Sequence, residues 1–302
     1  MYIGPLTLHP ESNMQVALNG IVQGLLFAIM GVAFSLVYSA TRTFHVALCG
    51  IIALTPYVLL ASLESGLGWV TGLIFATAIA CLIGWLCEDL MHWPLLRKGA
   101  PPEVHLIASL GALLVIVQVV VLLWGADAQV LQTGIDGVFS FGEIRLTWAQ
   151  VWAAITAIVL LAVFFFWLDR SALGLQFRAM ADNAILLSLL GRDVRKLRRL
   201  VFAVSAGLSG IAAIATAHDV GFDPHGGLKV VLIGIAATII GGRGSLGGAA
   251  AVGFALGIIR NEIVWLTSSQ WEDAITFLLL ALVLFARPEG LFGRKLRLEE
   301  KV

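Results

Sequence analysis

The chain has 302 residues, no net charge, 59% hydrophobic residues and only 13% charged residues. A soluble globular domain carries about 25% charged residues, so the composition excludes an ordinary soluble protein. The zero net charge also gives no electrostatic basis for binding nucleic acid.

Long apolar runs recur along the whole chain, and a membrane-spanning helix needs about 20 mostly apolar residues. We therefore predict an all-α membrane protein with about nine transmembrane helices (eight to ten) in a single domain over residues 1–302. The first thirteen residues lack a basic stretch and the apolar run after them is too long for a signal peptide, so none is expected. In chain order the predicted spans are 14–40, 45–63, 69–91, 104–124, 148–168, 197–217, 228–240, 248–266 and 272–286.

Basic residues in short loops predict the orientation, because Lys and Arg stay on the cytoplasmic side. The loops 40–44 and 92–103, the segment 169–199 and the tail after Ala286 carry most of them. We expect these four segments to be cytoplasmic, with the N-terminus outside and the C-terminus inside a bacterial inner membrane. The basic residues are Arg42, Arg97, Lys98, Arg170, Arg178, Arg192, Arg195, Lys196, Arg198, Arg199, Arg287, Arg294, Lys295, Arg297 and Lys301. The segments expected outside contain Asp127, Asp136, Glu143, Glu262 and Asp273.

The first span contains a GxxxG pair, Gly20 and Gly24, and the eighth contains another, Gly253 and Gly257. Small residues at this spacing let two helices approach closely in lipid. Three cysteines, Cys49, Cys81 and Cys87, lie in apolar stretches without a CxxC pair. This pattern predicts apolar packing rather than a disulfide framework or a metal site.

Two predicted helices are short or interrupted. The helix 228–240 would be only about 20 Å long at 1.5 Å per residue, against a hydrocarbon core of about 30 Å. The glycine-rich stretch 241–248 follows it, and 45–63 contains a proline. Interrupted helices in the two halves of a transporter point to an inverted repeat around the substrate route. The alternative is an ordinary short helix with a glycine loop at the cytoplasmic face.

The candidates for lining the substrate route come from these two elements. They are His45, Thr55, Tyr57, Gly241 and Gly242. A histidine at the start of a helix is more often a cap or a packed residue than a ligand, and that alternative stays open for His45.

The segment 171–199 combines helical spacing of apolar residues with many charges. Met180, Ala184, Leu187 and Leu190 recur at near-helical intervals, and Gly191 is suited to ending a helix. We expect one or two short amphipathic helices at the cytoplasmic surface. A solvated linker is the alternative.

The order of residues in this segment resembles the cytoplasmic coupling segment of the LivH/LivM family of branched-chain amino acid ABC permeases. The residues that carry the resemblance are Gly174, Arg178, Ala179, Ala181, Asp182, Leu190 and Gly191. The stretches 223–229, 240–248 and 287–293 and the glycines Gly20, Gly24 and Gly31 are also similar to family motifs, so the likeness covers nearly the whole chain.

The resemblance implies a type II ABC importer permease fold with a coupling segment at about 171–196. In such permeases this segment docks into a groove of the ATPase, which implies a coupling role for Arg178, Ala181, Asp182, Leu187, Leu190 and Gly191. The implied partners are a second homologous permease (heterodimer expected, homodimer open), two ABC ATPases, a periplasmic binding protein and the lipid bilayer.

The sequence lacks the motifs of several other functions. The chain has no GxxxxGK[ST], no HExxH and no Ser-His-Asp arrangement, so we expect no enzyme and no cofactor, with ATP bound by partner subunits. No isolated acidic residue stands at the middle of a span, which argues against proton coupling. One departure from the family is Leu48-Cys49, where relatives carry His-Gly. The expected cargo is a branched-chain or other hydrophobic amino acid; urea, an amide, or an ATP-independent channel or secondary carrier are the alternatives.

Overall fold

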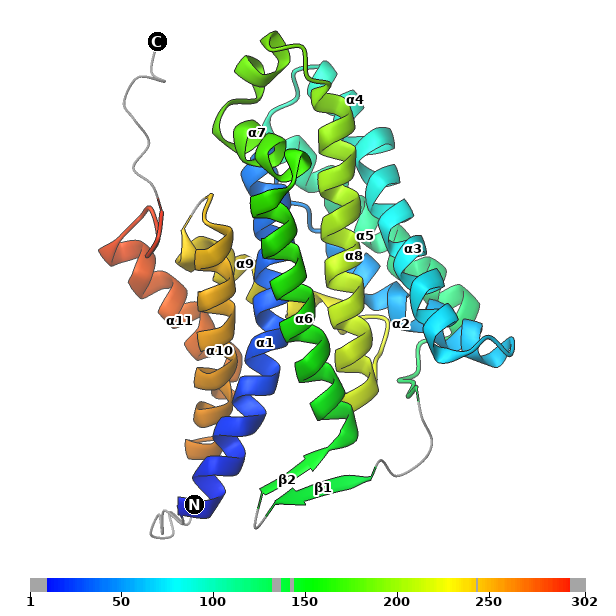
Figure 1. Ribbon diagram of the computed structural model, residues 1–302, viewed down its shortest axis with the longest axis vertical. Coiled ribbons are helices and arrows are strands. Elements are labelled where there is room, and N and C mark those ends of the chain that lie inside the picture. The colour runs from blue at the N-terminus through cyan, green and yellow to red at the C-terminus, as the bar shows by residue number, and fades with distance from the viewer. Residues whose placement is uncertain (1–9, 132–136, 142–143, 243, 294–302) are drawn as a thin grey trace.

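The computed structural model describes residues 10–131, 137–141, 144–242 and 244–293, and within them the protein is an elongated helical bundle (Figure 1). Asp136, Glu143, Arg243, Arg294, Lys295, Arg297 and Lys301 lie outside the described residues. The helices are α1 (Pro10–Thr41), α2 (Leu48–Glu64), α3 (Trp69–Cys87), the π-helix η1 (Glu88–His92), α4 (Trp93–Arg97), α5 (Pro102–Trp124), α6 (Trp148–Arg170), α7 (Ala172–Leu189), α8 (Val194–Val220), α9 (Gly227–Gly241), α10 (Leu246–Leu266) and α11 (Trp271–Ala286).

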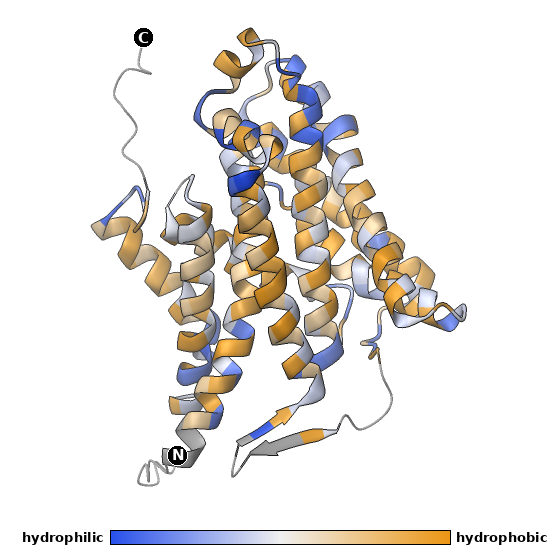
Figure 2. Ribbon diagram, in the orientation of Figure 1, coloured by the Kyte–Doolittle hydropathy of each residue, from blue (hydrophilic) through white to orange (hydrophobic). Residues whose placement is uncertain are grey.

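Each predicted span corresponds to a helix of the structure, with ends that differ by a few residues. Six helices of the described chain are long and apolar enough to cross a membrane, and α3, η1 and α4 together form one of them. The other three, α2, α9 and α11, have 17, 15 and 16 residues. The apolar side chains occupy the middle of the bundle and the polar ones its two ends (Figure 2), which is the distribution that a bilayer requires.

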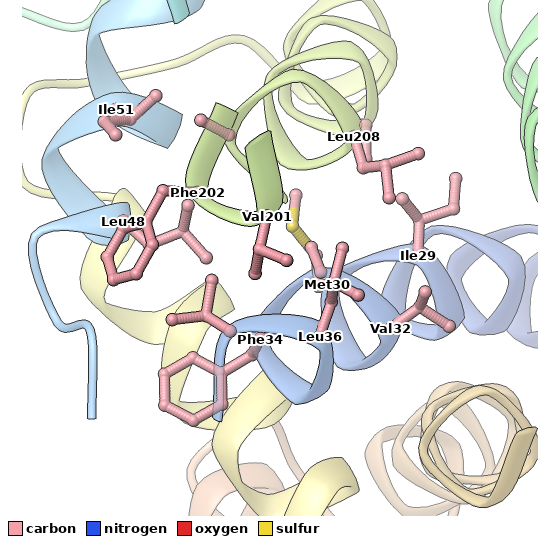
Figure 3. Packing of buried hydrophobic residues seen from close by; sticks show 14 of the residues in the cluster. Ile29, Met30, Val32, Phe34, Leu36, Leu48, Ile51, Val201, Phe202 and Leu208 are labelled. Atoms are coloured by element: carbon pink, nitrogen blue, oxygen red, sulfur yellow. The ribbon is translucent and has the colours of Figure 1, made fainter. Parts of the chain in front are cut away.

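The central helix is α1, which contacts α6, α7, α8, α9 and α10. A helix that is apolar on all sides is buried rather than amphipathic, and α1 fits this description. Its residues Ile29, Met30 and Phe34 pack in the core with Val201 and Phe202 of α8 (Figure 3). The core therefore lies where α1 crosses α8, and the other helices are arranged around this crossing.

The two GxxxG pairs permit close helix contact, as expected, and they meet each other. Gly24 of α1 lies against Phe254 of α10, where a Cβ would come within 2.5 Å of the Phe254 carbonyl oxygen. Gly253 faces Phe27 in the same way, at 2.6 Å from its carbonyl oxygen. The backbones of α1 and α10 thus touch directly, and residues larger than glycine would force them apart.

A small β-hairpin at one end of the bundle was not predicted. Strand β1 (Val138–Phe141) pairs antiparallel with β2 (Ile144–Thr147), and β2 leads directly into α6. The side-chain amide of Gln15 on α1 extends the pairing. It donates to the carbonyl of Arg145 and accepts from the Arg145 N–H, both at 2.8 Å. The hairpin and α7 lie at opposite ends of the molecule (Figure 1), and both ends are rich in polar residues (Figure 2).

Candidate functional site

The segment that resembles a coupling region is α7, which is bent at Asn183. The backbone of Asn183 is not helical (φ −155°, ψ 99°), and its side-chain oxygen accepts from the N–H of Leu186 at 2.9 Å. Asn183 is therefore the N-cap of a second short helix. The prediction of one or two short helices in this region is confirmed, with the bend between them at a capping residue.

The first half of α7 is fastened to the bundle. Phe177 and Met180 are buried, and Arg178 forms an ion pair with Asp169 at the end of α6, at 2.7 Å. Arg42, in the segment after α1, donates to the carbonyl of Ala181 at 3.4 Å. Both polar contacts are largely exposed, so burial of the two apolar side chains stabilises this half more than the charges do.

The second half of α7 presents apolar side chains to the outside. Ile185, Leu186, Leu189 and Leu190 are exposed, Leu189 to 78%. Leu187 lies on the opposite side of this short helix and is 5% exposed, which fixes the helix to the protein. We call the four exposed residues the α7 patch.

The α7 patch ends at a tight cap. Gly191 has φ +77°, its N–H bonds to the Ser188 carbonyl at 3.0 Å, and the Arg192 N–H bonds to the Leu187 carbonyl at 3.3 Å. These two bonds form a Schellman motif, which confirms the predicted role of Gly191 in ending the helix. After it, Asp193 caps α8, and a hydrogen bond from the Lys196 backbone N–H lowers the pKa of its carboxyl.

The six predicted coupling residues are thus brought together on one segment but differ in what they face. Arg178, Asp182, Leu190 and Gly191 are exposed, Ala181 is half-buried and Leu187 is buried. Three exposed residues of this segment were not among those predicted: Ile185, Leu186 and Leu189. A signal for them was present in the sequence. Residues 185–190 are apolar at every position except Ser188, so a short helix formed by them must have apolar side chains on both its buried and its exposed side.

A cleft of about 330 Å³ opens near the hairpin end, between α1, α2, α8 and the start of α9. We call it the hairpin-side cleft. Its wall includes Pro56 and Ile52 of α2, Asp223 in the α8–α9 loop, and Gly227 and Lys229 in the first turn of α9.

This cleft contains groups of both electrostatic signs. Pro56 has no N–H, so the Ile52 carbonyl lacks the bond that residue 56 of a helix ordinarily donates. That carbonyl and the Asp223 carboxylate can accept from an ammonium group. The first N–H groups of α9 have no partner within the helix, and together with Lys229 they favour an anion. Such an arrangement suits a small zwitterion.

Two predicted route residues flank Pro56 without lining the cleft. The Thr55 hydroxyl donates to the Ile51 carbonyl at 2.6 Å. Tyr57 is fully buried against Phe222 and Trp124, with ring centroids 4.7 and 5.6 Å away, and its hydroxyl has no partner among the described residues.

Gly241 and Gly242, at the end of α9, are held by the segment after α11. Leu291 donates to the Ile240 carbonyl at 2.7 Å and Phe292 to the Gly241 carbonyl at 3.1 Å. Gly242 has φ +100° and touches the backbone of Gly293. Neither glycine belongs to the wall of the hairpin-side cleft. The glycines are required here by close backbone packing, which agrees with the alternative of a glycine loop after a short helix.

His45 belongs to a buried chain of three histidines. Its Nδ1 lies 3.2 Å from Nε2 of His92 in η1, and Nδ1 of His92 lies 3.1 Å from Nδ1 of His105 in α5. His45 also packs edge-on against Phe202 of α8 at 4.7 Å. The histidine is therefore a packed residue that joins the α1–α2 loop to α5. No group of three His, Cys, Asp or Glu in the described part of the chain is arranged to hold a metal ion.

Next to the histidines, two carboxylates of η1 pair with arginines of α8. Glu88 pairs with Arg198 inside the protein, and Asp89 pairs with Arg195 and Arg199. The structure places the partners of these carboxylates more than 100 residues further along the chain.

A second cleft, of about 340 Å³, lies at the other end of the molecule between α1, α6, α7 and the start of α10. We call it the α7-side cleft. Ser39, Arg178, Asp182, Leu246 and Gly247 are part of its wall.

Comparison with known proteins gives a consistent result. The family model for the permease component of the branched-chain amino acid transport system matches residues 16–284. BraD, a high-affinity branched-chain amino acid transport permease protein of Pseudomonas aeruginosa, is 26% identical over 296 residues, which cover 93% of this chain and 96% of BraD. LivH of Escherichia coli, with the same description, is 26% identical over 298 residues, 93% of this chain and 96% of LivH.

The chain is also similar to a permease of another import system and to one solved structure. LsrC, an autoinducer 2 import system permease protein of Yersinia pseudotuberculosis, is 29% identical over 261 residues, 81% of this chain and 69% of LsrC. Among solved structures, PsaBC from Streptococcus pneumoniae in complex with Fab superposes with a TM-score of 0.52 over 90% of this chain and 91% of the other. Its sequence identity is 12%, so the likeness is one of fold.

Proposed function

The chain belongs to the family of branched-chain amino acid transport permease components, and on this premise we propose that it imports an α-amino acid with an apolar side chain. It is a multi-pass inner-membrane permease subunit of an ABC importer with a type II permease fold, as its sequence predicted. The cargo, the residues that act on it and the arrangement of partners are the proposed part.

The observation that carries the proposed energy coupling is the α7 patch. Four large apolar side chains face outward at the polar end of the molecule, and exposed apolar clusters bounded by polar residues mark sites of protein association. We propose that Leu189 and Leu190 enter a groove of an ABC ATPase while charged residues that flank the patch fix the register. Leu187 holds the helix from behind, so a movement of the ATPase reaches α6 and α8 through α7.

In this proposal the chain provides the membrane pathway but does not itself hydrolyse ATP. We propose that ATP binds to two partner ATPases, that this chain holds no cofactor, and that residues 1–302 act as one permease domain. A second, homologous permease would complete the membrane part, preferentially as a heterodimer, and a periplasmic binding protein would deliver the cargo.

The proposed orientation puts the α7 end in the cytoplasm. Arg42 follows α1 and Arg97 and Lys98 end α4, at the α7 end of the molecule. Asp127 follows α5 and Glu262 lies near the end of α10, at the hairpin end (Figure 1). Basic residues are retained on the cytoplasmic side. The N-terminus is then outside and the C-terminal tail inside.

The cargo class follows from the hairpin-side cleft, which opens toward the outside in this orientation. We propose that the α9 N-terminus and Lys229 bind the cargo carboxylate and that Asp223 and the Ile52 carbonyl bind its ammonium group. Met30 and Val230 supply apolar wall for the side chain. Urea and simple amides are uncharged and would leave these charged groups without partners.

The test is uptake by the complete importer in proteoliposomes that contain the two ATPases and the binding protein. Labelled leucine should accumulate only with ATP, and an Asp223→Ala variant should lose most uptake while retaining its ATPase partners. Uptake without ATP would establish a channel or secondary carrier instead. Uptake of urea in preference to leucine would overturn the cargo assignment.

A further inference from the structure

We propose that the α7-side cleft binds a zwitterionic α-amino acid from the cytoplasmic side, separately from the hairpin-side cleft. The inference goes beyond the proposed function, because import requires no recognition of amino acid on the cytoplasmic side. Three features of the cleft carry it: the free start of α10, a buried hydroxyl without a partner, and an unpaired carboxylate.

The first feature is the N-terminus of α10, a helix of 21 residues. Ser245 caps it by accepting from the Gly248 N–H at 3.0 Å, so the N–H groups of Leu246 and Gly247 remain without a partner from the helix. Both residues line the cleft. Helix N-termini attract carboxylate and phosphate groups through these N–H groups and through the helix dipole.

The second feature is the hydroxyl of Ser39 on α1, which points independently to a ligand. Ser39 is 5% exposed, lines the same cleft, and its hydroxyl has no hydrogen-bond partner among the described residues. Other helical hydroxyls in this protein, such as those of Thr41 and Thr55, donate to the carbonyl four residues earlier. A buried hydroxyl without a partner is costly, and a carboxylate oxygen in the cleft would satisfy it.

The third feature is the charge balance of the wall. Arg178 is paired with Asp169, whereas Asp182 has no ion-pair partner in the described part of the chain. The free carboxylate of Asp182 disfavours a simple anion such as phosphate and favours a ligand that also carries a cation. A zwitterion places its carboxylate at the α10 N-terminus and Ser39 and its ammonium group at Asp182.

The remaining wall suits an apolar side chain. Leu36, Phe165 and Phe177 contribute apolar surface, and the volume of about 340 Å³ falls within the range of small-molecule sites. Because α1, α7 and α10 all contribute to the wall, a bound amino acid would connect the coupling segment to the central helix. Cargo that has accumulated in the cytoplasm would then hold α7 in place and slow further import.

The test uses inside-out membrane vesicles from cells that produce the complete importer, with Cys49, Cys81 and Cys87 replaced by serine. A Gly247→Cys variant is labelled with a charged, membrane-impermeant maleimide. A Cβ at Gly247 meets no atom within 4 Å, so the cysteine fits. Leucine at millimolar concentration should slow the labelling severalfold, whereas isocaproate, which lacks the ammonium group, and isoamylamine, which lacks the carboxylate, should not.

Two matched controls complete the design. A Lys98→Cys variant, at an exposed position after α4 and outside the cleft, should label at the same rate with and without leucine. Adding Ser39→Ala to Gly247→Cys should raise the leucine concentration for half-protection roughly tenfold, as expected for a lost hydrogen bond to a charged group. Ser35→Ala should not, because Ser35 is equally buried and unpartnered but does not line the cleft.

The labelling rate does not depend on transport, so its outcome is separate from that of the uptake test. Absence of protection by leucine, or absence of labelling at residue 247, would overturn the proposal. Equal protection by isocaproate would show a plain anion site and overturn the assignment to a zwitterion. If Ser39→Ala and Ser35→Ala change the leucine concentration for half-protection equally, the Ser39 hydroxyl does not bind the ligand.

Discussion

Glu88 and Arg198 form an ion pair that joins η1 to α8 inside the protein. Their side chains are 0% and 5% exposed, and a second bond runs from Arg198 Nη2 to Glu88 Oε2 at 3.1 Å. Two parallel bonds of this kind fix the planar guanidinium group against the carboxylate. The pair ties the end of the long helix formed by α3, η1 and α4 to the start of α8.

We expect Glu88→Ala to destabilise the purified permease strongly, because the guanidinium of Arg198 would remain buried without a partner. Breaking a buried pair from one side costs about 3–5 kcal/mol. Replacing both residues by methionine should recover much of the loss. The measurement is the midpoint of thermal unfolding in detergent; a double variant as unstable as Glu88→Ala would contradict this account.

The contact of α1 with α10 predicts a strong dependence on glycine. Gly253→Val would place side-chain atoms on the Phe27 carbonyl, which lies 2.6 Å from the position of a Cβ. We expect loss of folded protein in size-exclusion chromatography. The matched control is Gly111→Val on α5, where a Cβ meets nothing within 4 Å, and it should behave like the unmodified protein.

The α7 patch predicts a separation of assembly from folding. The double substitution Leu189→Ser and Leu190→Ser should abolish co-purification of the ATPases while the permease keeps its unfolding midpoint, because both side chains are exposed. Leu187→Ser should instead lower the midpoint, because burial of a leucine contributes about 1.5–3 kcal/mol. If the double variant retains its ATPases, the patch is not the docking site.

The histidine chain predicts a structural role for His92. His92→Leu removes the partner of both His45 and His105, and each buried polar group left without a bond costs about 1–3 kcal/mol. We expect a lower unfolding midpoint. His225→Leu, at an exposed position, is the control and should have no effect. Equal midpoints for the two variants would show that the chain of rings does not contribute to stability.

Much of this fold could be predicted because apolar length is a local property. Nine spans, the glycine pairs and the cap at Gly191 all follow from residues within one or two turns of each other. The bend at Asn183 was also encoded locally, since asparagine is a preferred N-cap. It was missed because the apolar pattern continues across it.

The partners of Glu88 could not be predicted, because no local pattern says which of several arginines a distant helix will present. The two clefts could not be predicted for the same reason, because residues far apart in sequence form their walls. Pro56 and Asp223 are far apart in sequence and lie in one wall only because α2 and α9 meet. The hairpin was missed for a different reason: two four-residue strands between membrane helices carry too short an alternation to be distinguished from a loop.

The meeting of the two short helices has an electrical consequence for the cell. Gly227 at the start of α9 touches the backbone of Cys49 at the start of α2. The N-termini of the two helices therefore meet at a buried position. Each carries about half a positive charge, and away from water such a field opposes passing cations. A permease must let amino acids pass without also letting ions leak across the membrane. We expect the paired helix starts to oppose leakage of protons and potassium ions through the permease.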